Sequence, residues 1–443
     1  MCRSSQYCRL PIFKIRVLTK AIYVVTDVKL IRKLQTHPKI LFDPLYVLAA
    51  ERLGGTSEER ARDMRREQDA DRTKLKSTIG RTHMRLNHFL KPGPSLDALL
   101  NGVIRNTVKE LKPVGSTKLF EWTQYIVTIV GSETIYGPRN PFRDNPLLEQ
   151  AFWDYEASIP LLMLNAFPTF LASKGVRARN LLRQAFSEYF SEGGASSASD
   201  LIRANHAANR EHGVSNNDQG GFELITCIGL LVNTPPTLFW ILYHIYSNPE
   251  LLSEIRHELL AAAENGEVDL KQLPSRCALL YSVFQEVLRC HASSLSTRIV
   301  VEDVILDDGM LLKKGSAVHM PSSVLHSKQS YWNAPVNSFD PFRFMAKDGL
   351  QQDVCTDSTA FRPFGGGATL CPGRHFARGE ILGMAVLIIA RFDIVPLDGQ
   401  WPLPKEYEGT MTTTVLPPRD DIDVSFIRNR DPGLGDLQLV VGA

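Results

Sequence analysis

The pattern of apolar and polar positions is clearest over residues 224–246, a run of 23 residues without a formal charge. Such a run is typical of a membrane span or of a helix buried in a large protein. Its centre, Asn233-Thr234-Pro235-Pro236-Thr237, places polar side chains and two prolines in mid-helix. Proline removes the hydrogen bond to the carbonyl four residues back, so the carbonyls of Leu231 and Val232 lose their partners and the helix kinks. Free carbonyls beside polar side chains favour a buried site over lipid.

Helical spacing of apolar residues marks three more segments. Residues 119–130 form one, and Asn248-Pro249-Glu250 begins another, because these residues are favoured at the N-cap, the first position and the first turn. A third helix follows Cys371, with apolar residues recurring from 376 to 388. By contrast, residues 193–220 are rich in Gly, Ser, Ala and Asn, which predicts a mobile connection.

Short β-branched runs predict a small amount of sheet, with Asp27 as the N-cap of the helix that follows the first two strands. The predicted strands are 13–18, 21–25, 298–301, 304–306 and 310–312. Helical segments outnumber these strands and cover more of the chain. The pattern therefore predicts a mostly α fold with a small β-rich part, in one large domain or two packed lobes.

Composition narrows the class of protein. A hydrophobic content of 44% in 443 residues suffices for one large core. A net charge of +2, with both signs mixed along the chain, gives no basic surface for nucleic acid, so we predict no nucleic-acid partner. The seven scattered cysteines contain no Cys-x-x-Cys pair, which favours reduced thiols in an intracellular protein. Residues 1–12 lack the apolar run of a signal peptide or anchor and predict a short N-terminal extension.

Candidate chemistry is concentrated in the segment Phe361-Arg362-Pro363-Phe364-Gly365-Gly366-Gly367-Ala368-Thr369-Leu370-Cys371-Pro372-Gly373. Proline is favoured at the first helical position, so Pro372 predicts Cys371 as the N-cap. Unpaired N–H groups and the positive end of the helix dipole favour a thiolate there. The glycines let the backbone approach a flat, bulky group, beside which Phe364 packs. An inert buried cysteine is the alternative.

The spacing Phe364-x-x-Gly367-x-x-x-Cys371-x-Gly373 resembles the haem-ligand loop of the cytochrome P450 family. The resemblance implies a single domain over residues 1–443 with the cytochrome P450 fold, and haem b with Cys371 as the axial thiolate ligand of the iron. It also implies that Phe364, Gly367 and Gly373 belong to the cofactor-binding loop. The family often has arginine or histidine two residues before the cysteine, in contact with a haem propionate, where this chain has Thr369.

Two further motifs follow in the order of that family. Glu286 and Arg289 are three apart on a predicted helix, which by itself indicates a surface ion pair worth ~0–1 kcal/mol. The resemblance implies instead that Arg343 joins them in a buried structural triad, although Phe342 stands where the family commonly has glutamate. It also implies that Arg298 pairs with a haem propionate, whereas a solvated arginine at the end of a strand is the alternative.

The central helix departs from the family pattern. Aligned by register, Gly229 takes a small-residue place, Val232 the place of an acid and Asn233 the place of a threonine. Asn-Thr followed by proline resembles the branch of bile-acid sterol hydroxylases and prostacyclin synthase. Asn233 and Thr234 are therefore the catalytic candidates, as groups that hold water or oxygen near the iron, and ordered water replaces the missing acid.

The resemblance implies a haem-thiolate monooxygenase that inserts one oxygen atom of O2 into an apolar small-molecule substrate, in lipid or secondary-metabolite biosynthesis. Electrons would come from an NADPH-dependent flavoprotein reductase. The expected location is the cytoplasm or the cytoplasmic face of the endoplasmic reticulum, with membrane association but no anchor in this sequence. Three alternatives stay open. They are a haem-thiolate isomerase or dehydratase that needs no reductase, a non-catalytic haem-binding homologue, and a single-span membrane protein.

Overall fold

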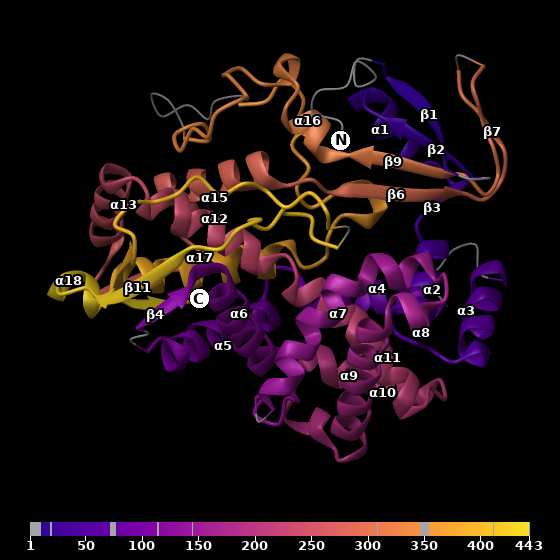
Figure 1. Ribbon diagram of the computed structural model, residues 1–443, viewed down its shortest axis with the longest axis horizontal. Helices are drawn as coiled ribbons and strands as arrows, with labels where there is room; N and C mark the ends of the chain where they lie inside the picture. The colour runs from indigo at the N-terminus through magenta and orange to yellow at the C-terminus, as the bar shows by residue number, and fades with distance from the viewer. Residues whose placement is uncertain are drawn as a thin grey trace.

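Helices with apolar faces form the centre of the structure (Figure 1). They are α6 (Leu119–Tyr136), α12 (Thr234–Tyr246), α15 (Ala278–His291) and α17 (Arg374–Arg391), and α12 packs against the other three. All positions of α17 from Gly379 to Ala390 are buried, which is typical of a helix in the middle of a large protein. The helices predicted over residues 119–130 and after Cys371 are confirmed.

The computed structural model describes residues 10–17, 20–70, 77–112, 115–143, 145–307, 309–345, 354–410 and 412–442. Of the predicted extension over 1–12, residues 1–9 lie outside this part. The other helices are α1 (Val28–Leu34), α2 (Asp43–Arg52), α3 (Glu58–Ala70), α4 (Thr78–Leu90), α5 (Pro94–Glu110), α7 (Pro146–Leu164), α8 (Pro168–Leu171), α9 (Ser173–Ser191), α10 (Asp200–Glu211), α11 (Asn216–Leu231), α13 (Pro249–Ala262), α14 (Leu273–Arg276), α16 (Ser322–His326) and α18 (Pro432–Gly435).

The largest sheet of the described chain has five strands and lies at a corner of the molecule, away from the central helices (Figure 1). Its order is β1 (Ile12–Val17), β2 (Lys20–Val25), β9 (Ala317–Pro321), β6 (Leu295–Val300) and β3 (Ile40–Leu41). Smaller sheets join β10 (Phe392–Pro396), β11 (Asp423–Arg428) and β4 (Ser116–Lys118); β12 (Gln438–Val440) and β5 (Glu267–Asp269); and β7 (Val304–Ile305) and β8 (Leu311–Leu312).

The predicted strands are confirmed, apart from Leu18, which lies outside the described residues. The first two pair antiparallel, with Ile12 opposite Val25. The Asp27 side chain accepts a hydrogen bond from the Leu30 N–H over 2.9 Å, so it caps α1 as predicted. The prediction of a mostly helical fold with a small β-rich part is also confirmed.

Residues 193–220, for which the composition predicted a mobile connection, are mostly helical. They form a 3₁₀ turn over Gly194–Ser197, then α10, and then the first residues of α11. The reason is that Leu201, Ile202 and Asn205 lie on one face of α10 and are buried there. Small residues serve close packing here, since a Cβ at Gly220 would lie 2.4 Å from the carbonyl oxygen of Arg183 on α9.

The run of apolar residues that dominates the sequence is broken in the middle. It forms α11 and α12, which meet at Val232 and Asn233, so the predicted kink is confirmed as an interruption. By length and composition the combined segment Asn216–Tyr246 could cross a membrane, but 67% of its most apolar window is buried inside the protein. Since α12 lies among α6, α15 and α17, it is a core helix and not a membrane span.

Candidate functional site

Cys371 lies between a 3₁₀ turn over Gly367–Thr369 and α17. Its backbone N–H donates to the Phe364 carbonyl over 3.0 Å, which closes the glycine-rich segment into a loop. The prediction of Cys371 as the helix N-cap is wrong by two residues, because Gly373 is the N-cap and α17 begins at Arg374. The backbone of Cys371 is used to close the loop and a turn, in which the Arg374 N–H donates to the Cys371 carbonyl over 3.4 Å.

The thiol of Cys371 is held by backbone donors. Burial raises the pKa of the thiol, while hydrogen bonds from the N–H groups of Gly373 and Arg374, together with the charge of Arg374, oppose that rise. A metal ion would remove the remaining cost, since a coordinating thiol is deprotonated outright. In the described ranges, no three His, Cys, Asp or Glu side chains are grouped to hold a metal. One thiolate without protein co-ligands fits an iron whose other ligands come from haem.

The glycines shape the loop around this cysteine. Gly365 and Gly367 have φ angles of +76° and +65°, which favour glycine. A Cβ at Gly367 would lie 2.9 Å from Cγ of Gln35, just after α1, so glycine lets the loop pack closely there. Phe364 is partly buried against the main core. At Gly373 a Cβ would lie 3.8 Å from the cysteine Sγ atom, which is ordinary contact. Direct contact of Phe364, Gly367 and Gly373 with the cofactor stays a prediction.

Arg298, on β6, reaches the cysteine loop. It is only 3% exposed, and it donates to the Thr297 carbonyl over 3.0 Å and to the Thr369 hydroxyl. Burial lowers its pKa, with a smaller opposing influence from Asp43. Among the described residues Arg298 forms no ion pair, and a buried cation normally has one. The site therefore fits a group that brings its own carboxylates, as haem does with its two propionates.

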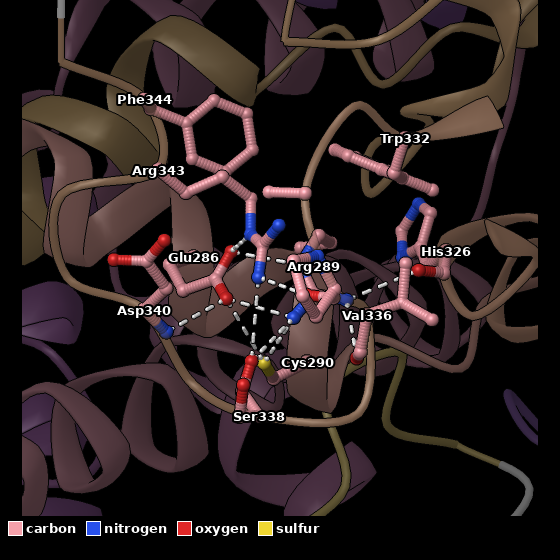
Figure 2. A network of polar contacts seen from close by, with 12 residues as sticks. Glu286, Arg289, Cys290, His326, Trp332, Val336, Ser338, Asp340, Arg343 and Phe344 are labelled. Carbon is pink, nitrogen blue, oxygen red and sulfur yellow. Dashed lines mark hydrogen bonds and ion pairs between the residues drawn. The ribbon is translucent and has the colours of Figure 1, made fainter.

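The three residues of the predicted triad meet in one network (Figure 2). Arg289 donates through Nε and Nη2 to the two carboxylate oxygens of Glu286, each over 2.7 Å. Arg343 donates through Nε to Glu286 Oε2 over 2.9 Å. The Glu286 side chain is fully buried and each arginine side chain is 2% exposed, so the alternative of a surface ion pair is wrong.

The triad also binds the chain that leads toward the cysteine loop. Arg289 Nη1 donates to the carbonyls of His326 and Val336, each over 3.1 Å, and Arg343 Nη2 donates to the Pro335 carbonyl over 2.6 Å (Figure 2). Carbonyl and carboxylate acceptors together occupy most guanidinium donors. The network therefore fixes the backbone of residues 326–343 to α15. Phe342, which replaces the family's usual glutamate, is half exposed.

The two catalytic candidates are tied to neighbouring segments. Asn233 Oδ1 accepts hydrogen bonds from the N–H and the hydroxyl of Thr414 over 2.6 and 2.8 Å. The Thr234 hydroxyl is buried and donates to Glu380 Oε2 over 3.0 Å. Because both side chains already have protein partners, their action on water or oxygen stays a prediction.

Glu380, on α17, is a residue that sequence reasoning missed. It is 1% exposed, and its Oε1 atom has no hydrogen-bond partner in the part of the chain that the structure describes. Burial raises the pKa of Glu380 to about 8, against a lowering by the Thr234 hydrogen bond. The signal was the one acidic residue of α17, placed directly before the apolar run 381–390. Arg362 is a second missed residue, 4% exposed and placed two positions before Phe364 in the loop.

Comparisons with known proteins agree over nearly the whole chain. The sequence model of the family described as Cytochrome P450 matches residues 5–422. The chain is 32% identical to cytochrome P450 monooxygenase nodJ of Hypoxylon pulicicidum, over 95% of this chain and 84% of that protein. It is 26% identical to a cytochrome P450 monooxygenase of Gibberella zeae, over 96% and 83%. Cytochrome P450 7A1 of Rattus norvegicus is 26% identical over 44% of this chain and 42% of its own.

Solved structures give the same fold. Retinoic acid-bound cyanobacterial CYP120A1 superposes with a TM-score of 0.70 at 21% identity, covering 95% of this chain and 92% of that one. The cytochrome P450DA heme domain superposes with a TM-score of 0.68 at 16% identity, covering 99% and 93%. At such low identity these structures bear on the fold alone.

Proposed function

Because the chain belongs to the cytochrome P450 family, we propose that it inserts one oxygen atom of O2 into an apolar small-molecule substrate. Membership makes the protein an oxidoreductase of the monooxygenase type with a haem cofactor, as the sequence predicted. The observation that carries the proposal is Cys371, whose thiol is held by the N–H groups of Gly373 and Arg374 at the start of α17. We place the reaction in lipid or secondary-metabolite biosynthesis.

When bound, haem supplies the oxygen chemistry, because an axial thiolate favours cleavage of the O–O bond. The residues of this chain hold that group and limit what reaches it. Cys371 ligates the iron, and the Phe364 carbonyl keeps the loop closed by accepting the Cys371 N–H. Arg298 neutralises a propionate, since it is buried beside Thr369 without an ion pair in the described chain.

Proton supply rests on the break between α11 and α12. Val232 stands where the family has an acid, so it cannot relay a proton. Glu380 offers a substitute for that acid. Burial raises the pKa of its carboxyl group to about 8, and its Oε2 atom accepts a hydrogen bond from the Thr234 hydroxyl over 3.0 Å. The prolines after Thr234 free carbonyls that can hold water beside this pair. We propose that Thr234 and Glu380 deliver protons through such water while Asn233 stays fixed to Thr414.

An apolar substrate suits the exposed stripe of α11. On α11, Ile225, Thr226, Ile228 and Leu230 are partly exposed and Gly229 is exposed, whereas residues 218–224 are buried. The partly exposed Asn233 follows as the N-cap of α12. A Cβ at Gly229 would meet nothing within 4 Å, so there is open space next to this face. Two isoleucines and a glycine present mainly hydrocarbon to that space, and an apolar ligand gains free energy by leaving water there.

The redox partner that a family member requires is proposed to be an NADPH-dependent flavoprotein reductase. Arg374 and Arg378, in the first turns of α17, form no ion pair with any described residue. They are therefore available to an acidic partner surface close to the cysteine loop, where electrostatic complementarity raises the rate of encounter.

We propose that the protein associates with a membrane through one exposed apolar surface. We also propose an intracellular location. Leu161, Leu164, Phe167 and Phe170, at the end of α7 and in α8, are 43%, 62%, 81% and 82% exposed. Large apolar side chains gathered in one segment favour insertion into a lipid interface. Flotation of the protein with anionic lipid vesicles tests this, and changing both Phe167 and Phe170 to Ser should abolish it. Equal flotation of this variant would contradict the proposal.

The decisive experiment is turnover with isotopically labelled O2. A library of apolar molecules is first screened for ligands that shift the Soret band of the holoprotein. A ligand found in this way should then be oxidised only with NADPH and a reductase present, with one labelled oxygen atom in the product. Turnover without NADPH, and without label, would instead establish the isomerase or dehydratase alternative, which the missing acid at Val232 favours.

A further inference from the structure

Arg362 is a buried cation whose position is fixed by its backbone. It is 4% exposed and lies in the segment that leads into the cysteine loop. Its N–H donates to His326 Nε2 over 3.1 Å, and its carbonyl accepts from the Ser294 hydroxyl over 3.4 Å. These contacts fix the backbone of Arg362 inside the protein, and its side chain is buried with it.

The guanidinium itself has few partners. Nη2 donates to the Gln35 side-chain oxygen over 3.2 Å, whereas Nε and Nη1 have no hydrogen-bond partner in the described chain. Arg362 forms no ion pair with a described residue either. Burial, followed by the nearby charge of Arg298, lowers the pKa of Arg362 to about 10, so the group remains charged at neutral pH. A charged group inside a protein is normally paired.

Arg298 and Arg362 therefore form a pair of buried cations that repel each other. Both lie close to the segment from Phe364 to Cys371, since Arg298 donates to Thr369, and a Cβ at Gly366 would lie 3.2 Å from Arg362 Nη2. Because residue 366 is glycine, no side chain at this position crowds Arg362 Nη2. Two arginines without carboxylates at one site match a ligand with two carboxylates, and haem b is a cofactor with two.

We propose that Arg362 binds a haem propionate and supplies the positive charge that position 369 lacks in this chain. Thr369 is neutral, where the related enzymes often have arginine or histidine. Its hydroxyl orients Arg298 by accepting from Nη2. The second cation then comes from Arg362, seven residues earlier in the sequence. In this chain Arg362 thus supplies the positive charge that related enzymes often have at the position of Thr369, so two cations are still available to the propionates.

The test measures how firmly the holoprotein keeps its haem, using transfer to excess apomyoglobin. Arg362→Gln should release haem roughly 10- to 100-fold faster, because one charge-assisted hydrogen bond to a propionate is lost. Arg362→Lys should release haem at a rate between those of the parent protein and Arg362→Gln, because lysine keeps the positive charge but not the planar guanidinium. The propionate bending band in the resonance Raman spectrum should shift in Arg362→Gln, which a merely structural role would not produce.

Arg179→Gln is the matched control. Arg179, on α9, is also partly buried with an unpartnered Nε, but it donates to the Arg52 carbonyl, away from the cysteine loop. It should leave haem release and the Raman band unchanged. Parent-like haem release and an unshifted band in Arg362→Gln would overturn the inference, as would equal effects of both substitutions. The inference rests on haem binding and not on the proposed reaction, so a failure of turnover would leave it standing.

Discussion

Two pairs of buried arginines in this protein differ in where their negative partner comes from. Arg289 and Arg343 share Glu286, with nitrogen–oxygen distances of 2.7 to 2.9 Å. Arg298 and Arg362 are similarly buried, at 3% and 4% exposure, but among the described residues they form no ion pair. The first pair joins α15 to the segment that carries Arg343. The second pair lies at the cysteine loop.

The difference separates a scaffold from a binding site. Guanidinium groups stay protonated at physiological pH, so a buried arginine cannot lose its charge to reduce the cost of desolvation. Both arginines of the scaffold pair contact one carboxylate of the chain itself, so each has an anionic partner once the chain has folded. The site pair is complete only with a ligand. Burial alone does not distinguish these functions, but the source of the carboxylate does.

The largest effect is expected when the proposed iron ligand, the thiolate of Cys371, is removed from the cysteine loop. Cys371→Ala should abolish the red-shifted Soret band that reduced protein gives under carbon monoxide, because that band requires a thiolate on the iron. Cys355→Ala is the control, since Cys355 is another partly buried free thiol but lies outside the loop. Absorption spectra of the two reduced, carbon monoxide-treated proteins decide the matter. Survival of the band in Cys371→Ala would remove the basis of the whole comparison.

The next largest effect is expected when the carboxylate shared by Arg289 and Arg343 is removed. Glu286→Ala leaves Arg289 and Arg343 buried without a carboxylate, and breaking a buried ion pair in this way costs roughly 3–5 kcal/mol. The expected result is loss of holoprotein, measured as haem per polypeptide after expression. Glu192→Ala is the control, because its contact with Arg139 is at the surface and is worth ~1 kcal/mol or less. Normal haem content in Glu286→Ala would show that the triad is not a scaffold.

The two regions were not equally predictable from the sequence. Glu286, Arg289 and Arg343 follow from a motif, and the cap at Asp27 and the break at the prolines follow from local rules that need no knowledge of the fold. Glu380 and Arg362 escaped because their importance lies in partners that they lack, which only the folded structure reveals. Local composition misled over residues 193–220, where small residues allow close packing of α11 on α9 and were taken for a flexible connection.

The cysteine loop shows the same limit at the scale of single residues. Pro372 correctly signalled the start of a helix, but the N-cap is Gly373 and not Cys371. The Cys371 N–H donates to the Phe364 carbonyl across the loop, and the Cys371 carbonyl accepts from the Arg374 N–H in a turn. The Gly373 carbonyl, and not that of Cys371, therefore accepts a helical hydrogen bond, from the Ala377 N–H over 2.8 Å. Local rules located the element, and longer contacts determined its first residue.

A smaller effect tests the geometry of the scaffold pair. Arg289→Lys should lower the thermal midpoint of the holoprotein more than Arg343→Lys. Arg289 contacts both oxygens of Glu286 and also the carbonyls of His326, Val336 and Ser338, whereas Arg343 reaches the carboxylate through Nε alone. Lysine provides one compact cation and cannot reproduce a bidentate contact, so a loss of about 1.5–3 kcal/mol is expected for Arg289→Lys. The reverse order would contradict the view that the planar fork is what matters.

The effect with the smallest change per step concerns Glu380, whose contribution varies gradually with pH; like the site arginines it is buried without an ion pair among the described residues, but it can change its charge. Burial raises its pKa to about 8, from 4.5 in the unfolded chain. The folded state therefore binds more protons than the unfolded state between these values. Stability should fall as pH rises through this window, by at most about 1.4 kcal/mol per pH unit.

Glu380→Gln should flatten that decline, measured as the thermal midpoint of the holoprotein from pH 6 to 9. Glu192→Gln is the control, because it also replaces a carboxylate by an amide but at the surface, where Glu192 is 69% exposed. Between pH 7 and 8 the two variants should therefore separate, and parallel slopes would refute the assignment to Glu380. A carboxyl group at this depth becomes neutral by keeping its proton. Arg362 has no such route, and for that reason its charge requires an anion from the cofactor.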